Sequence, residues 1–191
     1  MINGYIPAAR FLPFLSWTDV AALPDKSNTV IVLPTGAIEQ HGPHLPCSVD
    51  SVISSGVAGH ALARLPATIP AYAIPPIVYG KSEEHLHFPG TLTLSGDTLL
   101  HTLLEIAESL YRAGFRKLLM INGHGGQPQI LQIAGREMRL RHGDFIAIPH
   151  DVFNVPNCEK QFLSPHEQRM AMHAGHSETA HFLFSHFHTT T

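Results

Sequence analysis

Histidine and carboxylate side chains are concentrated in short polar segments of this 191-residue chain. The first segment, Thr35–Pro46, contains Glu39 and His41, and Asp50 follows shortly after it. Glu39 and His41 are two positions apart, so in an extended stretch their side chains project to the same side. Two carboxylates and an imidazole are suitable ligands for Zn²⁺, Mn²⁺ or Fe²⁺. A surface loop followed by a helix that Asp50 caps would explain the same residues without a metal.

The second segment, Asn122–Pro128, surrounds one histidine, His124, with three glycines. Glycines let the backbone turn sharply and approach another group closely, and we expect this imidazole to be exposed at a ligand-binding edge. A glycine-rich turn between a strand and a helix could instead hold a phosphate. The lysine and the hydroxyl residue of a P-loop are absent, and so is the G-x-G-x-x-G spacing, which weighs against the phosphate interpretation.

The third segment, His173–Thr179, places His173, His176 and Glu178 at the start of a predicted helix. The charge of Glu178 is favourable at a helix N-terminus whether or not the residue has another role. Helix electrostatics requires neither histidine, so a functional role remains open for both. A fourth segment, Tyr79–Thr91, also contains histidines and carboxylates, and it could line the same cleft or form an exposed, turn-rich loop.

Alternating strand and helix patterns position these segments. Short apolar or β-branched runs predict strands, and amphipathic stretches predict helices. The predicted strands are 29–33, a proline-broken 68–79, 117–121 and 145–148, and the predicted helices are 50–65, 95–112, 129–141 and 178–187. This alternation predicts right-handed crossovers and a mostly parallel sheet. Ligands bind beyond the carboxyl ends of such strands, and the polar segments follow them there.

The composition excludes several classes of protein. With 44% hydrophobic and 14% charged residues, the chain is too apolar to be disordered, and a net charge of -3 gives no basis for nucleic-acid binding. No apolar stretch is long enough to span a membrane. Cys47 and Cys158 are too far apart in sequence for a paired-cysteine zinc or redox motif. We expect one cytoplasmic domain over residues 1–191. Its low charge content indicates that part of its surface does not face water, either at a subunit interface or against a large buried sheet.

Four motifs, in order along the chain, closely resemble those of the creatininase (creatinine amidohydrolase) family. They are Glu39–Pro46 with Asp50, Ser82–Thr91, Asn122–Gly126 and His173–Thr179. The resemblance implies an α/β three-layer sandwich, with a mostly parallel central sheet flanked by helices. It also implies a two-metal site, hydrolysis of a non-peptide C–N bond, and a homo-oligomer that in this family is commonly a hexamer.

The resemblance also assigns roles to individual residues. The positions that match the family's metal ligands are Glu39, His41, Asp50 and His124, with Asp50 bridging the two ions. Glu178 matches a further carboxylate ligand, to which we also give a catalytic role, and His173 matches a histidine near the substrate. We expect two divalent metal ions, with Zn²⁺ as the first choice and Mn²⁺ or Fe²⁺ as alternatives.

The expected reaction is hydrolysis of a linear or cyclic amide in a small-molecule substrate by a metal-bound hydroxide. Two ions about 3.5–4 Å apart can share this hydroxide, because metal binding lowers the pKa of water from about 15.7 toward about 7. His173 or His176 would protonate the leaving nitrogen, since imidazole titrates near neutral pH. The residues expected to contact the substrate are Ser82, His85, Gly125 and His176.

Departures from the family pattern argue against creatinine as the substrate. Relatives that act on creatinine carry a tyrosine and a glutamate where this chain has Gly125 and Gly126, and they close the site with late tryptophans, whereas the only tryptophan here is Trp17. The glycine form is shared with branches that deformylate a pyrimidine intermediate or trim a peptide precursor. Typical members also continue for several dozen residues past the last motif, so we expect this chain to be short at its C-terminus, as a natural short form, a truncation or an altered reading frame.

Two functions of other classes stay open from the sequence. A non-catalytic metal-binding protein would use the same ligands without turnover. A phosphate- or nucleotide-binding module would instead depend on Asn122–Gln127.

Overall fold

The fold is built on a four-stranded parallel sheet. We analysed a computed structural model, which describes residues 2–156 and 158–187. The strands are β1 (Val30–Thr35), β2 (Ala71–Ala73), β3 (Lys117–Asn122) and β4 (Ile146–Asp151). They are hydrogen-bonded in the order β2-β1-β3-β4, and each pair is parallel. The carboxyl ends of β1 and β3 therefore lie side by side at one edge of the molecule.

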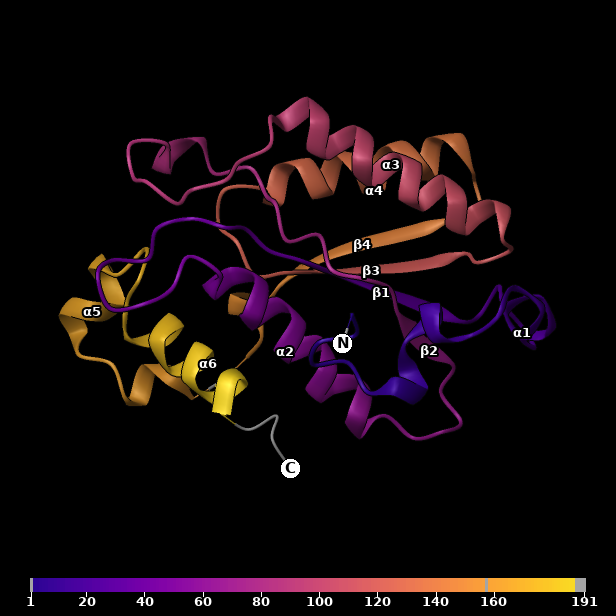
Figure 1. Cartoon of the computed structure of the whole chain (residues 1–191), viewed down its shortest axis with the longest axis horizontal. Helices are drawn as coiled ribbons and strands as arrows, with labels where there is room; N and C mark the ends of the chain where they lie inside the picture. Colours follow the sequence, from indigo (N-terminus) through magenta and orange to yellow (C-terminus); the bar gives the residue numbers. More distant parts are fainter. Residues whose placement is uncertain (1, 157, 188–191) are drawn as a thin grey trace.

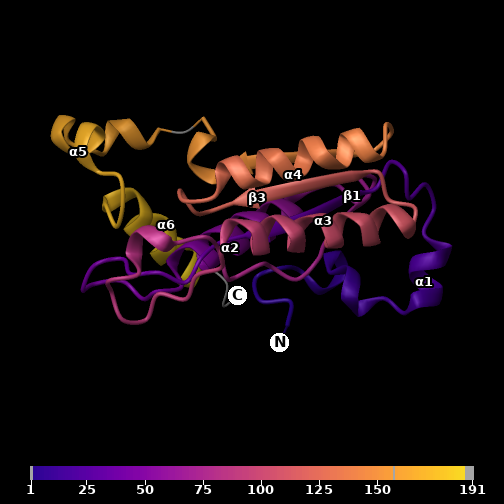
Figure 2. The same ribbon diagram turned by 90° about the horizontal axis from the view of Figure 1, so that it is seen from above.

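Helices cover both faces of the sheet and complete three layers. One face is covered by α3 (Gly96–Arg112) and α4 (Pro128–Arg141), and the other by α2 (Val49–Arg64), with α6 (His176–Phe187) packed against α2. Figure 1 shows these layers above and below the sheet, and Figure 2 shows α3 and α4 running side by side. The predicted α/β three-layer sandwich is confirmed.

A separate apolar core lies on each face of β1. Successive side chains of a strand point to opposite faces. Ile31 and Leu33 therefore join the core under α3 and α4, while Val32 joins the core under α2. Because β1 is packed on both sides, it provides a rigid base for the loop that follows it.

The predicted elements agree closely with the structure where their patterns are long. The strand expected over 68–79 is shortened to β2, because prolines at 70, 75 and 76 have no N–H to donate to a neighbouring strand. α6 begins at His176, two residues before its expected start, and β4 continues to Asp151. Two short helices, α1 (Trp17–Ala22) and α5 (Pro165–Met170), have no counterpart among the predicted elements, because six residues are too few to reveal a helical repeat. In the part of the chain that the structure describes, no helix is long and apolar enough to cross a bilayer.

Candidate metal centre

Four side chains from three parts of the chain converge at the carboxyl end of the sheet. The loop after β1 carries Glu39 and His41, the loop after β3 carries His124, and the first turn of α2 carries Asp50. All four are at most 3% exposed. Ionisable groups are rarely buried this deeply unless they pair with one another or bind a metal.

Asp50 lies between the two histidines. Its Oδ1 is 3.0 Å from His41 Nε2, and its Oδ2 is 3.0 Å from His124 Nδ1. Glu39 Oε1 is 3.3 Å from the same nitrogen of His124. The helix N-cap is Ser48, so Asp50 does not cap α2, and its carboxylate is placed to bridge two positions.

The outer nitrogens of both histidines are fixed by backbone carbonyls. His41 donates from Nδ1 to the carbonyl of Glu39 at 3.1 Å, and His124 donates from Nε2 to the carbonyl of Lys81 at 2.7 Å. A carbonyl only accepts, so each of these nitrogens carries a proton. In the neutral rings, His41 Nε2 and His124 Nδ1 therefore point lone pairs at carboxylate oxygens. Such an arrangement repels itself unless a cation or an additional proton lies between the groups, and it fits a metal site.

The carboxylates also present oxygens that no donor satisfies. Among the described residues, Glu39 Oε2 and Glu178 Oε2 are buried without a hydrogen-bond partner. Glu178 lies in the first turn of α6, and its Oε1 is 3.9 Å from His41 Nε2. Buried polar atoms are nearly always paired in folded proteins, so these oxygens also fit a site built for a cation.

The electrostatics of the metal-free cluster favour positive charge. Burial by itself would lower the pKa of His124, but hydrogen bonds and charges from Asp50 and Glu39 outweigh it and raise the pKa to about 10. Burial likewise opposes protonation of His41, whose pKa is nonetheless raised, chiefly by Asp50. Burial would raise the pKa of Asp50, yet the two histidines hold it below its usual range. A metal ion would replace these protons as the source of positive charge.

A buried amide network holds the loops that carry the ligands. The side chain of Gln127 donates to the carbonyl of Gly36 at 3.3 Å and to Asn122 Oδ1 at 2.9 Å, and it accepts from the backbone N–H of Lys81 at 3.3 Å. Gln127 is fully buried, so it joins the loops that follow β1, β2 and β3. Its role was not predicted, because an amide in a glycine-rich turn carries no signal of its partners.

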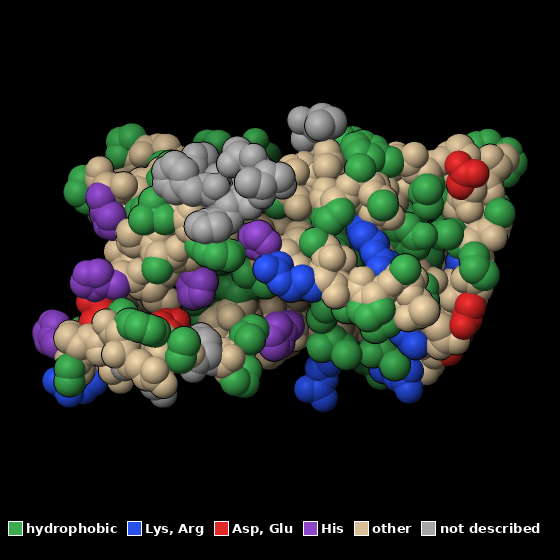
Figure 3. All heavy atoms as spheres, turned by 90° about the horizontal axis from the view of Figure 1, so that it is seen from below, with side chains coloured by type: hydrophobic (Ala, Val, Ile, Leu, Met, Phe, Trp, Pro, Cys, Tyr) green, Lys and Arg blue, Asp and Glu red, His purple; other side chains and the backbone are tan. Residues whose placement is uncertain are grey.

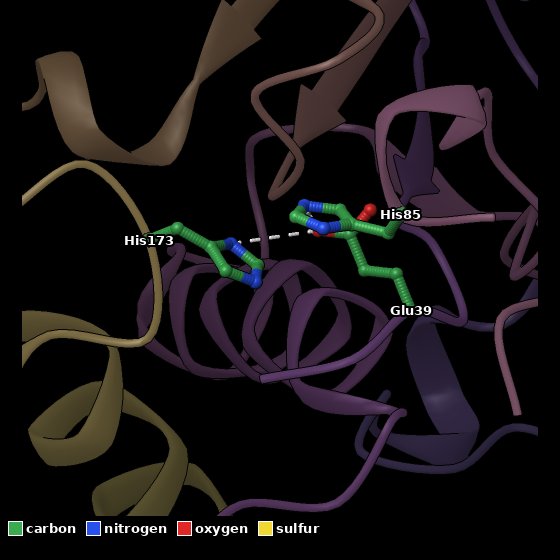
Figure 4. A group of neighbouring side chains, drawn as sticks. All are labelled: Glu39, His85 and His173. Carbon is green, nitrogen blue, oxygen red and sulfur yellow. Dashed lines mark ion pairs between the residues drawn. The ribbon is translucent and has the colours of Figure 1, made fainter. Parts of the chain in front are cut away.

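A cleft of about 580 Å³ opens over the cluster. Its walls include two histidines, His85 and His173, whose rings stack with centroids 4.4 Å apart. His85 Nε2 and His173 Nδ1 lie 3.8 Å and 3.7 Å from the same oxygen of Glu39. Figure 4 shows the two rings approaching Glu39 from different segments of the chain.

The structure separates the residues that were expected to contact substrate. His85 and Gly125 line the cleft, as expected. Ser82 is fully buried, and its hydroxyl lies 3.3 Å from His124 Nε2. It therefore contacts the candidate metal ligand His124 rather than lining the cleft. The side chain of His176 is 81% exposed and lies 3.2 Å from Glu167, and it lines a neighbouring cavity instead.

Glu84 belongs to the second family motif but was assigned no role from the sequence, and it also lines the cleft. Its carboxylate occupies the space beside Gly126, where an added β-carbon would lie 2.2 Å from Glu84 Oε1. The only sequence signal for Glu84 was its position next to His85 in the fourth polar segment. That position alone does not show whether a glutamate lines the cleft or is an exposed charge.

The fold and the cluster together define a three-layer α/β protein with a carboxylate–histidine metal centre. The family model described as creatinine amidohydrolase matches residues 14–189. The chain therefore belongs to the creatininase family, as its four motifs indicated.

Curated relatives carry more than one activity. The mycofactocin precursor peptide peptidase of Mycolicibacterium smegmatis is 34% identical over 79% of this chain and 56% of its own length. The creatinine amidohydrolase of Pseudomonas putida is 34% identical over 69% of this chain and 50% of its own length. The chain thus spans about half the length of the curated relatives it matches.

Solved structures agree with the fold. A creatininase described as the manganese form superimposes with a TM-score of 0.68 at 30% identity, covering 82% of this chain and 64% of that one. A mutant creatininase described as the zinc–zinc type also has a TM-score of 0.68, at 28% identity over 89% of this chain and 70% of that one.

Proposed function

We propose that this protein is a metal-dependent amidohydrolase that cleaves a non-peptide C–N bond in an amide or a cyclic amide. The observation that carries the proposal is the position of Asp50, whose two oxygens each lie 3.0 Å from a nitrogen of a different histidine. A carboxylate in this position can bridge two cations, and cation pairs about 3.5–4 Å apart recur in hydrolases.

Two divalent ions are the proposed cofactors, with Zn²⁺ as the first candidate and Mn²⁺ or Fe²⁺ as alternatives. Glu39, Asp50 and His124 would hold one ion. His41, Asp50 and Glu178 would hold the other. The solved relatives of manganese and zinc type support this choice. When bound, the ions supply Lewis acidity, which acidifies a water molecule and polarises the amide carbonyl.

His173 is the proposed proton carrier. Its Nε2–H donates to the carbonyl of Gln40 at 2.5 Å, which leaves Nδ1 with a lone pair 3.7 Å from Glu39. Nδ1 accepts a proton from the attacking water and returns it to the leaving nitrogen, so the ring ends in its starting state. Glu178, which also lines the cleft, is proposed to orient the water during this transfer.

A small-molecule amide is the proposed substrate, and creatinine itself is not. A β-carbon at Gly126 would lie 2.6 Å from the backbone carbonyl oxygen of Lys81 and 2.5 Å from His124 Nε2, so this position does not readily admit the glutamate of creatinine-cleaving relatives. Hydrolysis of a formamide or of a peptide precursor is the second candidate. It is favoured by the similarity to a mycofactocin precursor peptide peptidase.

We also propose that the protein is a cytoplasmic homo-oligomer, with the hexamer suggested by the family as the first candidate. In the part of the chain that the structure describes, β4 is an edge strand, and α4 packs against one of its faces. On its other face Ile146 is 45% exposed and Ile148 is 53% exposed, and burial against another subunit would remove this apolar surface from water. Hydrophobic side chains are also spread over the α2 and α6 side of the molecule (Figure 3).

Metal analysis of the purified protein, combined with a hydrolase screen, tests the proposed function. The screen uses formamides, cyclic amides and short peptides, before and after treatment with a chelator. We expect two metal equivalents per chain and hydrolysis that chelation abolishes. Bound metal without turnover would instead support a non-catalytic metal-binding protein. Nucleotide binding that survives chelation would support a phosphate-binding module on Asn122–Gln127.

A further inference from the structure

Gln40 lies between the ligands Glu39 and His41, yet its side chain is absent from the metal cluster. All four of its polar groups are engaged elsewhere. Its backbone N–H donates to Thr91 Oγ1 at 3.3 Å, and its backbone carbonyl accepts from His173. Its side-chain amide contacts the backbone of Gly42 and the ring of His85. One residue thus touches both histidines that wall the cleft.

The orientation of the Gln40 amide is unambiguous. The backbone N–H of Gly42 approaches one amide atom at 2.9 Å, and because an N–H only donates, that atom must be the oxygen. The other amide atom, 3.0 Å from His85 Nδ1, is therefore the NH₂ group.

The amide then determines the tautomer of His85. An NH₂ group only donates, so His85 Nδ1 must accept with its lone pair. In the neutral ring the proton is consequently on Nε2. This is the nitrogen that points into the cleft, 3.8 Å from Glu39 Oε1. His85 therefore presents an N–H donor to the cleft.

The backbone of the same residue determines the tautomer of His173. The carbonyl of Gln40 accepts from His173 Nε2, so the neutral ring leaves a lone pair on Nδ1. Nδ1 is the nitrogen on the cleft side, 3.7 Å from the same oxygen of Glu39. His173 is also packed against His41, with ring centroids 4.3 Å apart, which holds the ring in place.

We infer that Gln40 is a positioning residue that gives the cleft one fixed N–H donor, on His85, and one fixed lone-pair acceptor, on His173. The two rings are in the same tautomer but turn opposite edges to the cleft. A donor and an acceptor side by side complement an amide that has both a carbonyl oxygen and an N–H, which is a primary or secondary amide rather than a tertiary one. This substrate class rests on the proposed hydrolase function.

Imidazole ¹⁵N NMR on the zinc-loaded full chain tests the tautomers directly. His85→Asn and His173→Asn variants assign the signals. We expect both rings to be protonated at Nε2 and unprotonated at Nδ1. A wild-type His85 protonated at Nδ1 would overturn the inference without any need for a variant.

The variant Gln40→Met removes the amide while keeping a neutral side chain of similar length. We expect the two ¹⁵N shifts of His85 to move toward a common average as the ring exchanges between tautomers, while His173 keeps its spectrum because a backbone carbonyl holds it. Gln132→Met, at an exposed position of α4, is the matched control and should change neither ring. An unchanged His85 spectrum in the Gln40→Met protein would refute the positioning role.

Acetate mimics a carboxylate product, so its binding affinity tests whether His85 donates a hydrogen bond into the cleft. Loss of one fixed hydrogen bond should raise the dissociation constant of acetate about fivefold in the Gln40→Met protein. An unchanged affinity would contradict the donor role of His85. Neither measurement requires turnover, so a failed amide screen counts against the proposed function, whereas a wrong tautomer counts against Gln40 alone.

Discussion

At the scale of single residues, backbone carbonyls decide which nitrogen of each histidine faces the metal cluster. His41 and His124 use one nitrogen to donate to a carbonyl, which leaves the other nitrogen as a potential ligand. This arrangement fixes the tautomer and orients the ring before a metal binds. Asp50 completes it, because each of its oxygens faces one of these free nitrogens.

Replacing Asp50 by asparagine should disrupt both metal positions. The substitution keeps the shape of the side chain but removes the charge that the two histidines share, so metal affinity should fall by more than about 100-fold. Metal content after dialysis measures the loss. Asp144→Asn is the matched control, because Asp144 pairs with Arg116 at the surface, and it should retain full metal content.

Zinc binding should release protons even under mildly alkaline conditions. The pKa of His124 is raised to about 10 in the metal-free cluster, so its ligand nitrogen is protonated at pH 8 and must lose that proton to bind zinc. Calorimetry in buffers of different ionisation enthalpy counts the released protons. A binding heat that is independent of the buffer would contradict the protonated state of the cluster.

The same shift makes the stability of the metal-free protein depend on pH. The folded pKa of His124 lies above the unfolded value of about 6.5, so protonation stabilises the fold fully below pH 6.5. This contribution is lost as the pH rises toward 10. Thermal unfolding of chelated protein should therefore show a melting temperature that falls over this interval, and the zinc-loaded protein should lack this trend.

At the scale of elements, the site depends on close contact between the β3–α4 loop and the start of α2. A β-carbon on Gly123 would lie 2.5 Å from the carbonyl oxygen of Asp50, so only glycine allows this approach. Gln127 joins the same loop to those after β1 and β2. The helix and the loop thus hold Asp50 and His124 at a fixed separation.

Gly123→Ala should lower the free energy of unfolding by about 1–3 kcal/mol, because the backbone must shift to admit the methyl group. Metal affinity should fall as well, since the shift separates Asp50 from His124. Gly143→Ala adds the same group where no atom lies within 4 Å, and its effect should stay within about 0.5 kcal/mol. Denaturant titrations of both variants test the difference, and equal losses would contradict the contact.

At the scale of the whole molecule, strand β4 presents an edge and an exposed face that another subunit could contact. Within residues 2–156 and 158–187, β4 pairs only with β3, and its face opposite α4 exposes Ile146 and Ile148. Association between copies of this chain would bury this face.

Ile148→Lys should shift the protein toward smaller species in sedimentation velocity, because a charge cannot be buried cheaply in an apolar interface. Ile133→Lys introduces the same charge on the exposed surface of α4, away from this face, and should leave the distribution unchanged. If both variants sediment like the parent, the β4 face is not the subunit interface.

Much of the fold could be predicted because its signals are local. Strand and helix periodicity predicted the alternation that became β1 to β4 with α2, α3, α4 and α6. The polar segments after the strands predicted where the site would lie, since parallel strands end at one edge. The same signals did not predict which residues of these segments line the cleft. The side chain of Ser82 contacts His124 instead, and that of His176 lies beside Glu167.

The sequence by itself determined the types of candidate ligand, their order along the chain and the family, because these depend on residue identity and short-range spacing. Only the tertiary structure decided that Asp50 lies between two histidines and that Gln40 holds two others in defined tautomers. Gln40 and His173 are 133 positions apart, and their hydrogen bond exists only because the segment before α6 folds back onto the loop after β1, while α6 packs against α2. Such contacts depend on distances through space, which local sequence patterns do not encode.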